Sequence, residues 1–516
     1  MRFYTNVFVR GSYVYIRGYN SGKRFFDKVF YKPTLYEPSR EQSKFTTIDG
    51  HPVKPKKFDS MKLCRDYVKK YEDVDGFNFY GSTLHAYTFL NEKFQNDYDT
   101  DHIRIANIDI EVGSEDGFPE PADANQPITA ITIKQNNKVY VMGIGAYQNN
   151  REDVYYIDCK SETKLIDIFI KTWQKLDPDI VTGWNTRFFD IPYLINRITK
   201  IFGEYKAEQL SPWGIIQERT IERINRKDQT YELRGVAQLD YLELYKKFTY
   251  SAQESYRLDN IASVEVGEKK IDYSEFANLH QLHKLDYQKF IDYNIKDVEL
   301  VDRIEDKMGL ITLAMTIAYK GGVNYTDTFG TTAIWDTIIY RDLYENKIAI
   351  PFAEDKMKTP YPGGYVKEPI IGLHRNVVSF DLNSLYPSLI MQYNMSPETI
   401  ANGETTNLDV DSILNNPSIV NNNGKAVAAN GQYFNINKLG VLPKIINDLY
   451  TERVDIKKSM LDSQRELQKV NKNDKQDLYR IERDITIAEN RQMAIKILLN
   501  SLYGALGNRD FRFFDQ

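Results

Sequence analysis

In two pairs of residues, the spacing along the sequence places side-chain oxygen atoms on the same face of one element. Asp109 and Glu111 are two residues apart in the apolar, strand-like segment NIDIEV, so both carboxylates point to one face of a strand. Tyr293 and Asp297 are four residues apart in YNIKD, which places them on one face of a helix. A buried pair of carboxylates is costly unless a cation lies between them. Each spacing alone is more often structural, but if the carboxylates hold a metal, it should be a hard cation that prefers oxygen ligands, such as Mg²⁺.

A third motif adds a carboxylate between these two pairs along the chain. In GWNTRFFDIPY, Asn185 and Asp190 follow the short apolar segment DIVTGW, which predicts a buried strand. Taken alone, each of the three motifs is also compatible with a structural role. Their order, spacing and placement together match a family pattern, which is described below.

A second group of motifs lies nearer the C-terminus. The apolar segment NVVSFDL predicts a strand at 376–382 that delivers Asp381, and the chain then turns at NSLYPS. In KILLNSLYG, the residues Lys496, Asn500 and Tyr503 recur at i, i+4 and i+7, which makes one stripe of a helix. A lysine that reaches a phosphate and an aromatic ring that supports a base suit such a stripe.

Two basic residues precede this stripe. Arg453 and Lys457 are four residues apart in TERVDIKKSM, on one face of another predicted helix. They are candidates for further phosphate contacts, and a solvated basic face is the alternative explanation.

The composition excludes several classes of protein. The chain has 516 residues, of which 42% are hydrophobic and 27% charged, an ordinary globular balance with room for several domains. Lys and Arg number 67 and Asp and Glu 72, so the net charge of −5 leaves nucleic-acid binding to local grooves. Cys64 and Cys159 lack CxxC spacing, which excludes a disulfide framework and a cysteine zinc site. No segment approaches the roughly 18 apolar residues of a membrane span, so no membrane partner is expected.

The pattern along the chain predicts an α/β multidomain protein. Residues 1–104 mix short β-branched and aromatic runs, which are typical of hairpins. From residue 105, strand-like segments alternate with helical ones up to a helix predicted at 287–308, the pattern of an α/β domain. A Pro- and Gly-rich junction follows near 351–365. Two long helical patterns fill 441–505 and predict an antiparallel helical hairpin.

The first group of motifs resembles a known nuclease pattern. Asp109, Glu111, Asp190, Tyr293 and Asp297 match the three motifs of the DEDDy 3′→5′ exonucleases, which resemble ribonuclease H in fold. The resemblance implies that the four carboxylates hold two Mg²⁺ or Mn²⁺ ions about 4 Å apart against a phosphodiester. It also implies that Tyr293 helps to orient the attacking water.

The second group matches motifs A and B of the family B DNA polymerases, and the resemblance runs along essentially the whole chain. Segments such as YKPTLYEP, LDYLELYKKF and NSLYGALGN point to the replicative polymerases of T-even-type bacteriophages. The family implies that Asp381 and Leu382 bind catalytic metal, with two ions per active site. It implies that Tyr386 lies beneath the sugar of a deoxynucleoside triphosphate, where its ring would clash with a 2′-hydroxyl.

The resemblance also implies contacts with nucleotide and with DNA, both primer-template and single-stranded. The implied nucleotide contacts are Asn383, Ser384, Leu385, Tyr386, Arg453, Lys457, Lys496, Asn500 and Tyr503. The implied DNA contacts are Tyr361, Gly363, Gly364, Asn185, Phe118 and Gly504, of which the first three belong to a segment similar to the family's YxGG element. The segment ERINRKDQTYELRG resembles the hairpin that the family uses when the primer end leaves the template.

The family's architecture implies five regions. They are a mixed N-terminal domain at 1–104 to which 311–352 returns, a ribonuclease H-like exonuclease at 105–310, the first part of an α+β palm at 353–440, helical-hairpin fingers at 441–505, and the start of a second palm segment at 506–516.

The chain departs from the family in one respect. The second palm carboxylate, which the family supplies in a DTD motif, is expected beyond Gly504, where only twelve residues remain. A DTD string does occur at 99–101, in a polar loop without flanking apolar strands, and is interpreted as a coincidence. We therefore expect a second chain to supply the rest of the palm, the thumb and any clamp contact.

Two other functions stay open at this point. One is a free-standing 3′→5′ exonuclease, and the other is a non-catalytic DNA-binding remnant. The stripe of Lys496, Asn500 and Tyr503 counts against the first, since hydrolysis has no use for a triphosphate-binding helix. The intact carboxylates count against the second. The phage resemblance places the protein in the cytoplasm of an infected bacterial host.

Overall fold

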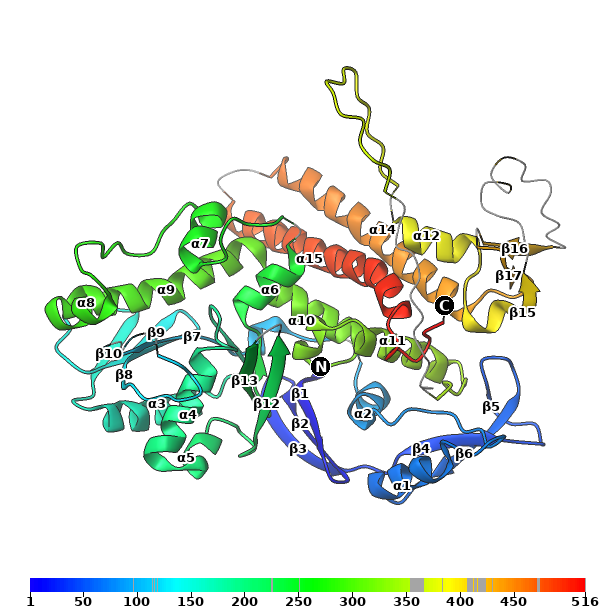
Figure 1. Cartoon of the computed structure of the whole chain (residues 1–516), viewed down its shortest axis with the longest axis horizontal. Coiled ribbons are helices and arrows are strands. Elements are labelled where there is room, and N and C mark those ends of the chain that lie inside the picture. The colour runs from blue at the N-terminus through cyan, green and yellow to red at the C-terminus, as the bar shows by residue number, and fades with distance from the viewer. Residues whose placement is uncertain are drawn as a thin grey trace. The chain divides into compact units, whose positions relative to one another are not determined.

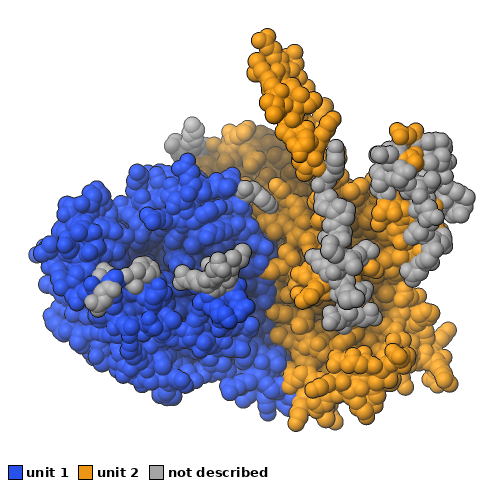
Figure 2. Space-filling view, viewed as in Figure 1, with its two compact units in different colours: residues 1–31, 92–319, 324–329 blue, residues 32–91, 320–323, 330–516 orange. Residues whose placement is uncertain are grey.

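The computed structural model describes most of the chain. It leaves out residues 96, 114, 116, 118, 224–225, 250, 353–365, 383, 406–411, 413–414, 416–423, 429, 471–473 and 516. The chain divides into two compact units, shown in blue and orange in Figure 2. Unit 1 comprises residues 1–31, 92–319 and 324–329, and unit 2 comprises residues 32–91, 320–323 and 330–516. The five regions expected from the sequence divide the chain more finely and stay a prediction.

Unit 1 begins with a three-stranded antiparallel sheet in the order β1-β2-β3 (Arg2–Arg10, Tyr13–Asn20 and Lys23–Phe30). Tight turns at Gly11 and Gly22 join the strands, and their φ angles of 66° and 76° suit glycine. These are hairpins of the kind that the aromatic and β-branched runs predict.

A six-stranded mixed sheet forms the centre of unit 1, in the order β10-β9-β8-β7-β11-β14. β7 runs parallel to β11 and antiparallel to β8, so the carboxyl ends of β7 and β11 meet at one edge of the sheet. The strands are β7 (Ile105–Val112), β8 (Ile128–Gln135), β9 (Lys138–Gly143), β10 (Val154–Asp158), β11 (Ile180–Thr182) and β14 (Ala237–Gln238).

Helices cover both faces of this sheet (Figure 1). On one face, α3 (Glu162–Leu176) and α4 (Asp190–Phe202) pack against apolar residues of β7 and β8. On the other face, α8 (Leu279–Leu285) and α9 (Tyr287–Met308) pack against apolar residues of β8 and β9. Helix α9 has the bounds that its apolar spacing predicts.

The remaining elements of unit 1 connect or flank these layers. Strands β12 and β13 pair antiparallel, in keeping with the hairpin that the resemblance of ERINRKDQTYELRG implies. The DTD string at 99–101 lies in a short 3-10 turn rather than in a strand hairpin. These elements are η1 (Thr100–His102), α5 (Glu204–Glu208), β12 (Ile216–Arg223), β13 (Arg226–Leu233), α6 (Tyr241–Phe248), α7 (Leu258–Val266), α10 (Leu310–Gly321, whose end belongs to unit 2) and η2 (Tyr325–Phe329).

The three-stranded and six-stranded sheets of unit 1 are tied together by the carboxylate of Asp179, which lies one residue before β11 and is fully buried. Thr5 and Tyr19 donate hydroxyl hydrogen bonds to it at 2.8 and 2.9 Å. The guanidinium of Arg24 donates at 2.6 Å, and the backbone N–H of Arg104 donates at 3.0 Å. A buried charge is tolerated only when it is paired and hydrogen-bonded in this way.

Unit 2 is mostly helical (Figure 1). Its two longest helices, α14 and α15, pack side by side and form the hairpin predicted at 441–505. Its elements are β4 (Thr34–Pro38), β5 (Phe45–Thr46), β6 (Pro52–Lys57), α1 (Met61–Tyr71), α2 (His85–Lys93, whose end belongs to unit 1), α11 (Thr332–Glu345), α12 (Leu385–Gln392), η3 (Pro397–Thr399), β15 (Ile400–Thr405), β16 (Lys425–Val427), β17 (Gln432–Asn435), α14 (Val441–Leu467) and α15 (Lys475–Leu506).

The strand predicted at 376–382 is wrong. Within 366–382, a segment that the structure describes throughout, no helix or strand forms. The physical reason is that a strand needs a hydrogen-bonded neighbour, and this segment pairs with no described strand. Eight apolar side chains are left between 68% and 98% exposed: Val366, Ile370, Ile371, Leu373, Val377, Val378, Phe380 and Leu382.

Across the described part of the chain, none of the helices combines the length and the apolar character needed to cross a membrane.

Candidate functional site

Strand β7 carries the first pair of acidic residues. Its even-numbered residues Ile108 and Ile110 belong to the core beneath α3 and α4. Because side chains alternate along a strand, Asp109 and Glu111 point to the opposite face, which α9 covers. The period of two in NIDIEV thus separates an apolar face from an acidic one.

Helix α9 brings Asp297 to this acidic face. One oxygen atom from each of Asp109, Glu111 and Asp297 lies within 4.8 Å of the others, a spacing that fits a shared cation. Tyr293 lies one turn before Asp297 on the same helix and is also buried. The structure therefore brings together four of the five residues of the first predicted group.

Asp190 approaches the same place from another element. It is the first residue of α4, and its Oδ1 accepts a 3.0 Å hydrogen bond from the backbone N–H of Ile110, between Asp109 and Glu111. Burial raises the pKa of Asp190 to about 7, although the hydrogen bond from Ile110 opposes the shift. The structure does not include Asp190 in the group of three ligand oxygens.

Crowding and burial disfavour ionisation of these carboxyl groups in the absence of a cation. Burial, followed by the charge of Asp297, raises the pKa of Glu111 to about 8. Burial also raises the pKa of Asp109, and the nearby carboxylates of Asp297, Asp190 and Glu111 add to the shift. A cation bound among them would reverse the preference, because its charge stabilises the ionised form.

The donor set fits a divalent cation. Among the described residues, Oδ1 of Asp297 is buried without a hydrogen-bond partner. An unpaired buried carboxylate oxygen is costly, and a bound cation would satisfy it. Asp109, Glu111 and Asp297 are the residues that would hold Mg²⁺ or Mn²⁺, since these ions prefer carboxylate oxygen.

Lys270 is a part of this site that the sequence analysis missed. Its Nζ donates hydrogen bonds of 2.5 Å to Oδ2 of Asp297 and 2.9 Å to the hydroxyl of Tyr293. Burial lowers the pKa of Lys270, but the charges of Asp297 and Tyr293 and the hydrogen bonds to them together outweigh burial and raise the pKa above its ordinary value. The only signal in the sequence was a lysine in the loop GEKKIDYS, which has no periodicity to link it to α9.

A buried aspartate shapes the loop after β11. Oδ1 of Asp240 accepts from the backbone N–H groups of Asn185 and Leu242 at 3.1 and 2.9 Å, and its Oδ2 accepts from that of Arg187 at 3.0 Å. Asn185 has a φ of 67°, a left-handed conformation that only a few residue types tolerate. Asp240 therefore holds the turn that leads from β11 to Asp190, and the sequence analysis did not single it out.

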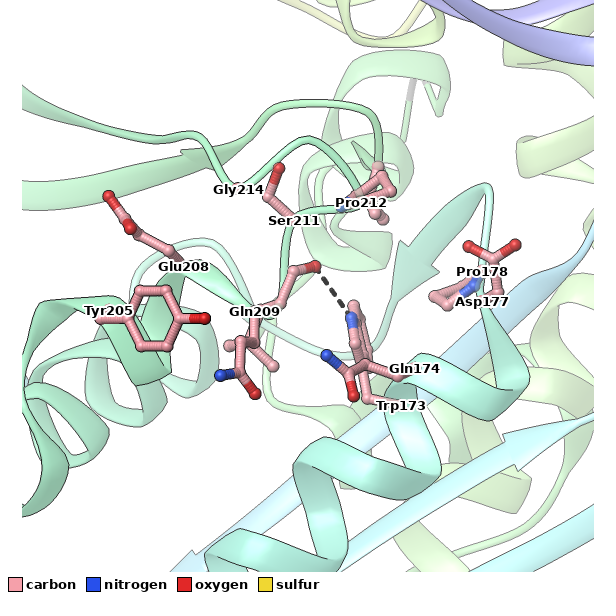
Figure 3. Close-up of a pocket in the computed structure, with 12 residues that line it drawn as sticks. Trp173, Gln174, Asp177, Pro178, Tyr205, Glu208, Gln209, Ser211, Pro212 and Gly214 are labelled. Atoms are coloured by element: carbon pink, nitrogen blue, oxygen red, sulfur yellow. Dashed lines mark hydrogen bonds between the residues drawn. The ribbon is translucent and has the colours of Figure 1, made fainter. Parts of the chain in front are cut away.

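The cavity shown in Figure 3 lies away from these carboxylates. It has a volume of about 320 Å³ and is lined in part by Asp177, Pro178 and Val236. These residues precede β11 and β14, so the cavity lies at the amino ends of the parallel strands. Inside it, the indole N–H of Trp173 donates a 2.9 Å hydrogen bond to the carbonyl of Leu210. It is separate from the acidic site.

The second group of predicted residues lies in unit 2. Asp381 and Leu382 are exposed in the segment without secondary structure, and Ser384 follows with a left-handed φ of 53° at the start of α12. Leu385 and Tyr386 are the first residues of α12, and both are exposed. The structure therefore does not surround Asp381 with other ligands from the described residues.

The predicted stripe on α15 is present. Lys496 is half-buried, and Asn500, Tyr503 and Gly504 are exposed. The ring of Tyr503 stacks on that of Tyr386, with centroids 4.3 Å apart and planes 5° from parallel. The structure thus brings one residue of the first polymerase motif against one residue of the second.

The two basic residues of α14 differ in their surroundings. Lys457 is exposed, whereas Arg453 is half-buried and its Nε is buried without a partner among the described residues.

Five predicted residues, namely Phe118, Tyr361, Gly363, Gly364 and Asn383, lie outside the described residues.

Comparisons with known proteins give the same family for the N-terminal and the C-terminal part of the chain. Residues 83–261 match the model of the exonuclease domain of DNA polymerase family B, and residues 331–515 match that of DNA polymerase family B. The chain is 32% identical to the DNA-directed DNA polymerase of Escherichia phage RB69, over 99% of this chain and 64% of that protein. For the DNA-directed DNA polymerase of Enterobacteria phage T4 the identity is 30%, over 96% of this chain and 62% of that protein. The chain belongs to family B of the DNA polymerases.

More distant relatives of this family B chain come from cellular organisms. The DNA polymerase delta catalytic subunit of Candida albicans is 26% identical over 78% of this chain and 38% of that subunit. The chain spans less than two thirds of the length of each of these phage relatives. The match to the exonuclease domain ends before α9, so Tyr293 and Asp297 join this site by their geometry.

Proposed function

We propose that this chain carries the 3′→5′ exonuclease and part of the polymerase site of a family B replicative DNA polymerase. The observation that carries the first half is the group of half-buried Asp109 with buried Glu111 and Asp297, in which one oxygen atom from each residue lies within 4.8 Å of the others. By resemblance, these residues belong to the exonuclease motifs, together with Asp190 and Tyr293. Single-stranded DNA and a mispaired primer end are the proposed substrates.

In the exonuclease, each group has a distinct task. A pair of bound Mg²⁺ ions would supply Lewis-acid stabilisation of the attacking and leaving oxygens of the phosphodiester. Asp109, Glu111 and Asp297 would hold these ions, with Asp190 as the fourth carboxylate. Tyr293 presents its hydroxyl toward the same face and would orient a water. Asn185, on the turn that Asp240 holds, would contact the DNA strand.

In the polymerase half, we propose that Asp381 and Leu382 bind catalytic metal and that α15 receives the triphosphate. The stacked rings of Tyr386 and Tyr503 support this assignment, because they join the two motifs that would enclose one nucleotide. Lys496, on the same stripe of α15, would reach the phosphates. Deoxynucleoside triphosphates and a DNA primer-template are the proposed ligands.

We further propose that synthesis requires a second polypeptide with the rest of the palm and the thumb. The support is the exposed apolar segment 366–382, which carries Asp381 and forms no strand. An exposed apolar segment that pairs with no described strand can serve as a template for strand addition. Any contact with a sliding clamp would then come through that polypeptide. The phage relatives support action in the cytoplasm of an infected bacterium.

The exonuclease is tested by incubating the chain with Mg²⁺ and 3′- or 5′-labelled single-stranded DNA. We expect digestion from the 3′ end, and we expect Asp109→Ala to abolish it. Asp158→Asn, on strand β10 of the same sheet, is the control and should digest normally. Undiminished digestion by Asp109→Ala would refute the site.

The polymerase half needs a separate experiment. The chain is mixed with a polypeptide that corresponds to the remaining third of a phage relative, and extension of a primer is measured. We expect synthesis that depends on both polypeptides and is lost with Asp381→Ala. Digestion without any synthesis under these conditions would favour the free-standing exonuclease instead.

A further inference from the structure

Asn294 lies between α9 and the central sheet, next to Tyr293 in the chain, and is fully buried. Its Nδ2 donates a 2.6 Å hydrogen bond to Oδ2 of Asp109. Its Oδ1 accepts a 2.5 Å hydrogen bond from the hydroxyl of Thr132, which is also fully buried. Three side chains from three elements, β8, α9 and β7, therefore form one continuous chain of hydrogen bonds.

The register of the sheet explains why these residues meet. Thr132 of β8 is the direct cross-strand partner of Asp109 on β7. Directly opposed residues point to the same face of a sheet, so both side chains face α9. From α9, the single side-chain amide of Asn294 then reaches both Asp109 and Thr132.

The chemistry of the three groups fixes the direction of the hydrogen bonds. An ionised carboxylate can only accept, so the amide must turn its NH₂ group toward Asp109. The carbonyl oxygen of Asn294 then faces Thr132, whose hydroxyl donates to it. Without Thr132, nothing in this chain of hydrogen bonds would hold the carbonyl oxygen in place.

We propose that Asn294 is a positioning residue of the exonuclease, which holds one oxygen of Asp109 so that the other remains free for the cation, and that Thr132 fixes the amide. The inference rests on the proposed function, because it concerns the cation site of that exonuclease. Metal-binding carboxylates are generally oriented by a second layer of hydrogen bonds, and loss of such a partner weakens metal binding by about 10–100-fold.

The position itself argues against a purely packing role. Its neighbours Ile291 and Ile295 on α9 belong to the apolar core against β8 and β9. An apolar residue at 294 would pack against the sheet without the desolvation cost of a buried amide. Among the described residues, the hydrogen bonds that compensate the amide are those with Asp109 and Thr132.

The first test measures Mn²⁺ binding to the whole chain without DNA, by electron paramagnetic resonance. Asn294→Ala should raise the dissociation constant for Mn²⁺ by about 10–100-fold. With saturating metal, the same variant should keep the KM for single-stranded DNA and lower kcat, because the amide touches the metal ligand and not the substrate. Circular dichroism checks that the variant is folded.

The second test uses a gentler change that keeps the shape of the site. Thr132→Val removes only the hydroxyl, and it should weaken Mn²⁺ binding in the same direction by a smaller factor. Thr132→Ser keeps the hydroxyl and should bind Mn²⁺ with the affinity of the wild-type chain. Thr182→Val is the matched control. Thr182 is a buried threonine on β11 of the same sheet, and its hydroxyl has no partner among the described residues.

A double variant separates a chain of contacts from two independent effects. Adding Thr132→Val to Asn294→Ala should not weaken Mn²⁺ binding further, since the hydroxyl acts through the amide. Wild-type Mn²⁺ affinity in Asn294→Ala would overturn the inference, and so would a loss in Thr182→Val equal to that in Thr132→Val. If Asn294→Ala does not fold, unchanged affinity in Thr132→Val overturns it.

These outcomes are distinct from failure of the proposed function. If the wild-type chain binds Mn²⁺ and Asn294→Ala does not, but neither digests DNA, the exonuclease assignment fails and the positioning role stands. If the wild-type chain digests DNA and Asn294→Ala binds Mn²⁺ equally well, only the positioning role fails.

Discussion

Lys270 donates a hydrogen bond of 2.5 Å to Oδ2 of Asp297, and Oδ1 of the same carboxylate has no partner among the described residues. One lysine therefore occupies one side of the carboxylate and leaves the other side available. The same ammonium lies 2.9 Å from the hydroxyl of Tyr293, so it sets the distance between two groups of the acidic site.

Replacement of Lys270 should impair the exonuclease. Lys270→Met removes both hydrogen bonds, and we expect kcat on single-stranded DNA to fall by about 10-fold or more, as for other residues that orient metal ligands. Lys269→Met changes the exposed neighbouring lysine and should have no effect. Equal rates for the two variants would contradict the assignment of Lys270.

The stability of the metal-free chain should depend on pH. Burial raises the pKa of Glu111 to about 8 and that of Asp190 to about 7, whereas carboxyl groups in an unfolded chain titrate near 4. Between these values the folded chain binds more protons than the unfolded chain. The free energy of unfolding should therefore fall as the pH rises from about 5 to about 8.

Urea unfolding in EDTA measures this effect. Mg²⁺ should restore stability most at the high end of the range, because it binds the ionised carboxylates. Glu111→Gln removes one titrating group and should flatten the profile. A stability that rises between pH 5 and pH 8 would be the opposite of the predicted sign.

Asp240 is expected to matter beyond its capping of α6. Asp240→Asn leaves one acceptor oxygen for three backbone N–H groups, so the turn that carries Asn185 should loosen. We expect the KM for DNA to rise and kcat to fall, each by several-fold. Asp286→Asn is the control at the N-cap of α9, where asparagine caps a helix as well as aspartate. Normal kinetics in Asp240→Asn would show that capping is its only role.

In unit 2, a buried ion pair should dominate the stability of its surroundings. Arg512 and Asp336 have side chains only 6% and 10% exposed, and Arg512 also donates to the carbonyl of Pro351 at 2.6 Å. Arg512→Met strands the carboxylate and should lower the free energy of unfolding by about 3–5 kcal/mol. The exposed pair of Arg509 and Asp510 gives the matched control, because Arg509→Met should change the free energy of unfolding by less than about 1 kcal/mol. Chemical denaturation of both variants checks the difference.

The sequence predicted the part of the acidic site that follows from periodicity. Two-residue spacing put Asp109 and Glu111 on one face of β7, and four-residue spacing put Tyr293 and Asp297 on one face of α9. These relationships are local, so the sequence contains them. The prediction that the two faces meet came from the resemblance to a known family. The structure brings these faces together.

Residues that act through tertiary contacts were missed. Lys270 and Asp240 precede or follow regular elements, where no periodicity predicts the neighbour of a side chain. Asn294 could have been recognised from the sequence, because it is a polar residue on a buried face of α9 and a buried amide needs hydrogen-bond partners. The strand predicted at 376–382 failed for the converse reason. Its apolar pattern is local, but a strand exists only with a neighbour.

The buried carboxylate of Asp179 also determines where this chain can be cut. The sheet that bears the acidic site begins at residue 105, but Thr5, Tyr19 and Arg24 supply three of the hydrogen bonds to Asp179. A protein that began at residue 105 would keep this carboxylate, one residue before β11, and lose those partners. The six-stranded sheet with its acidic site is therefore not an independent module, and its excision or transplantation into another protein must carry residues 1–31 with it.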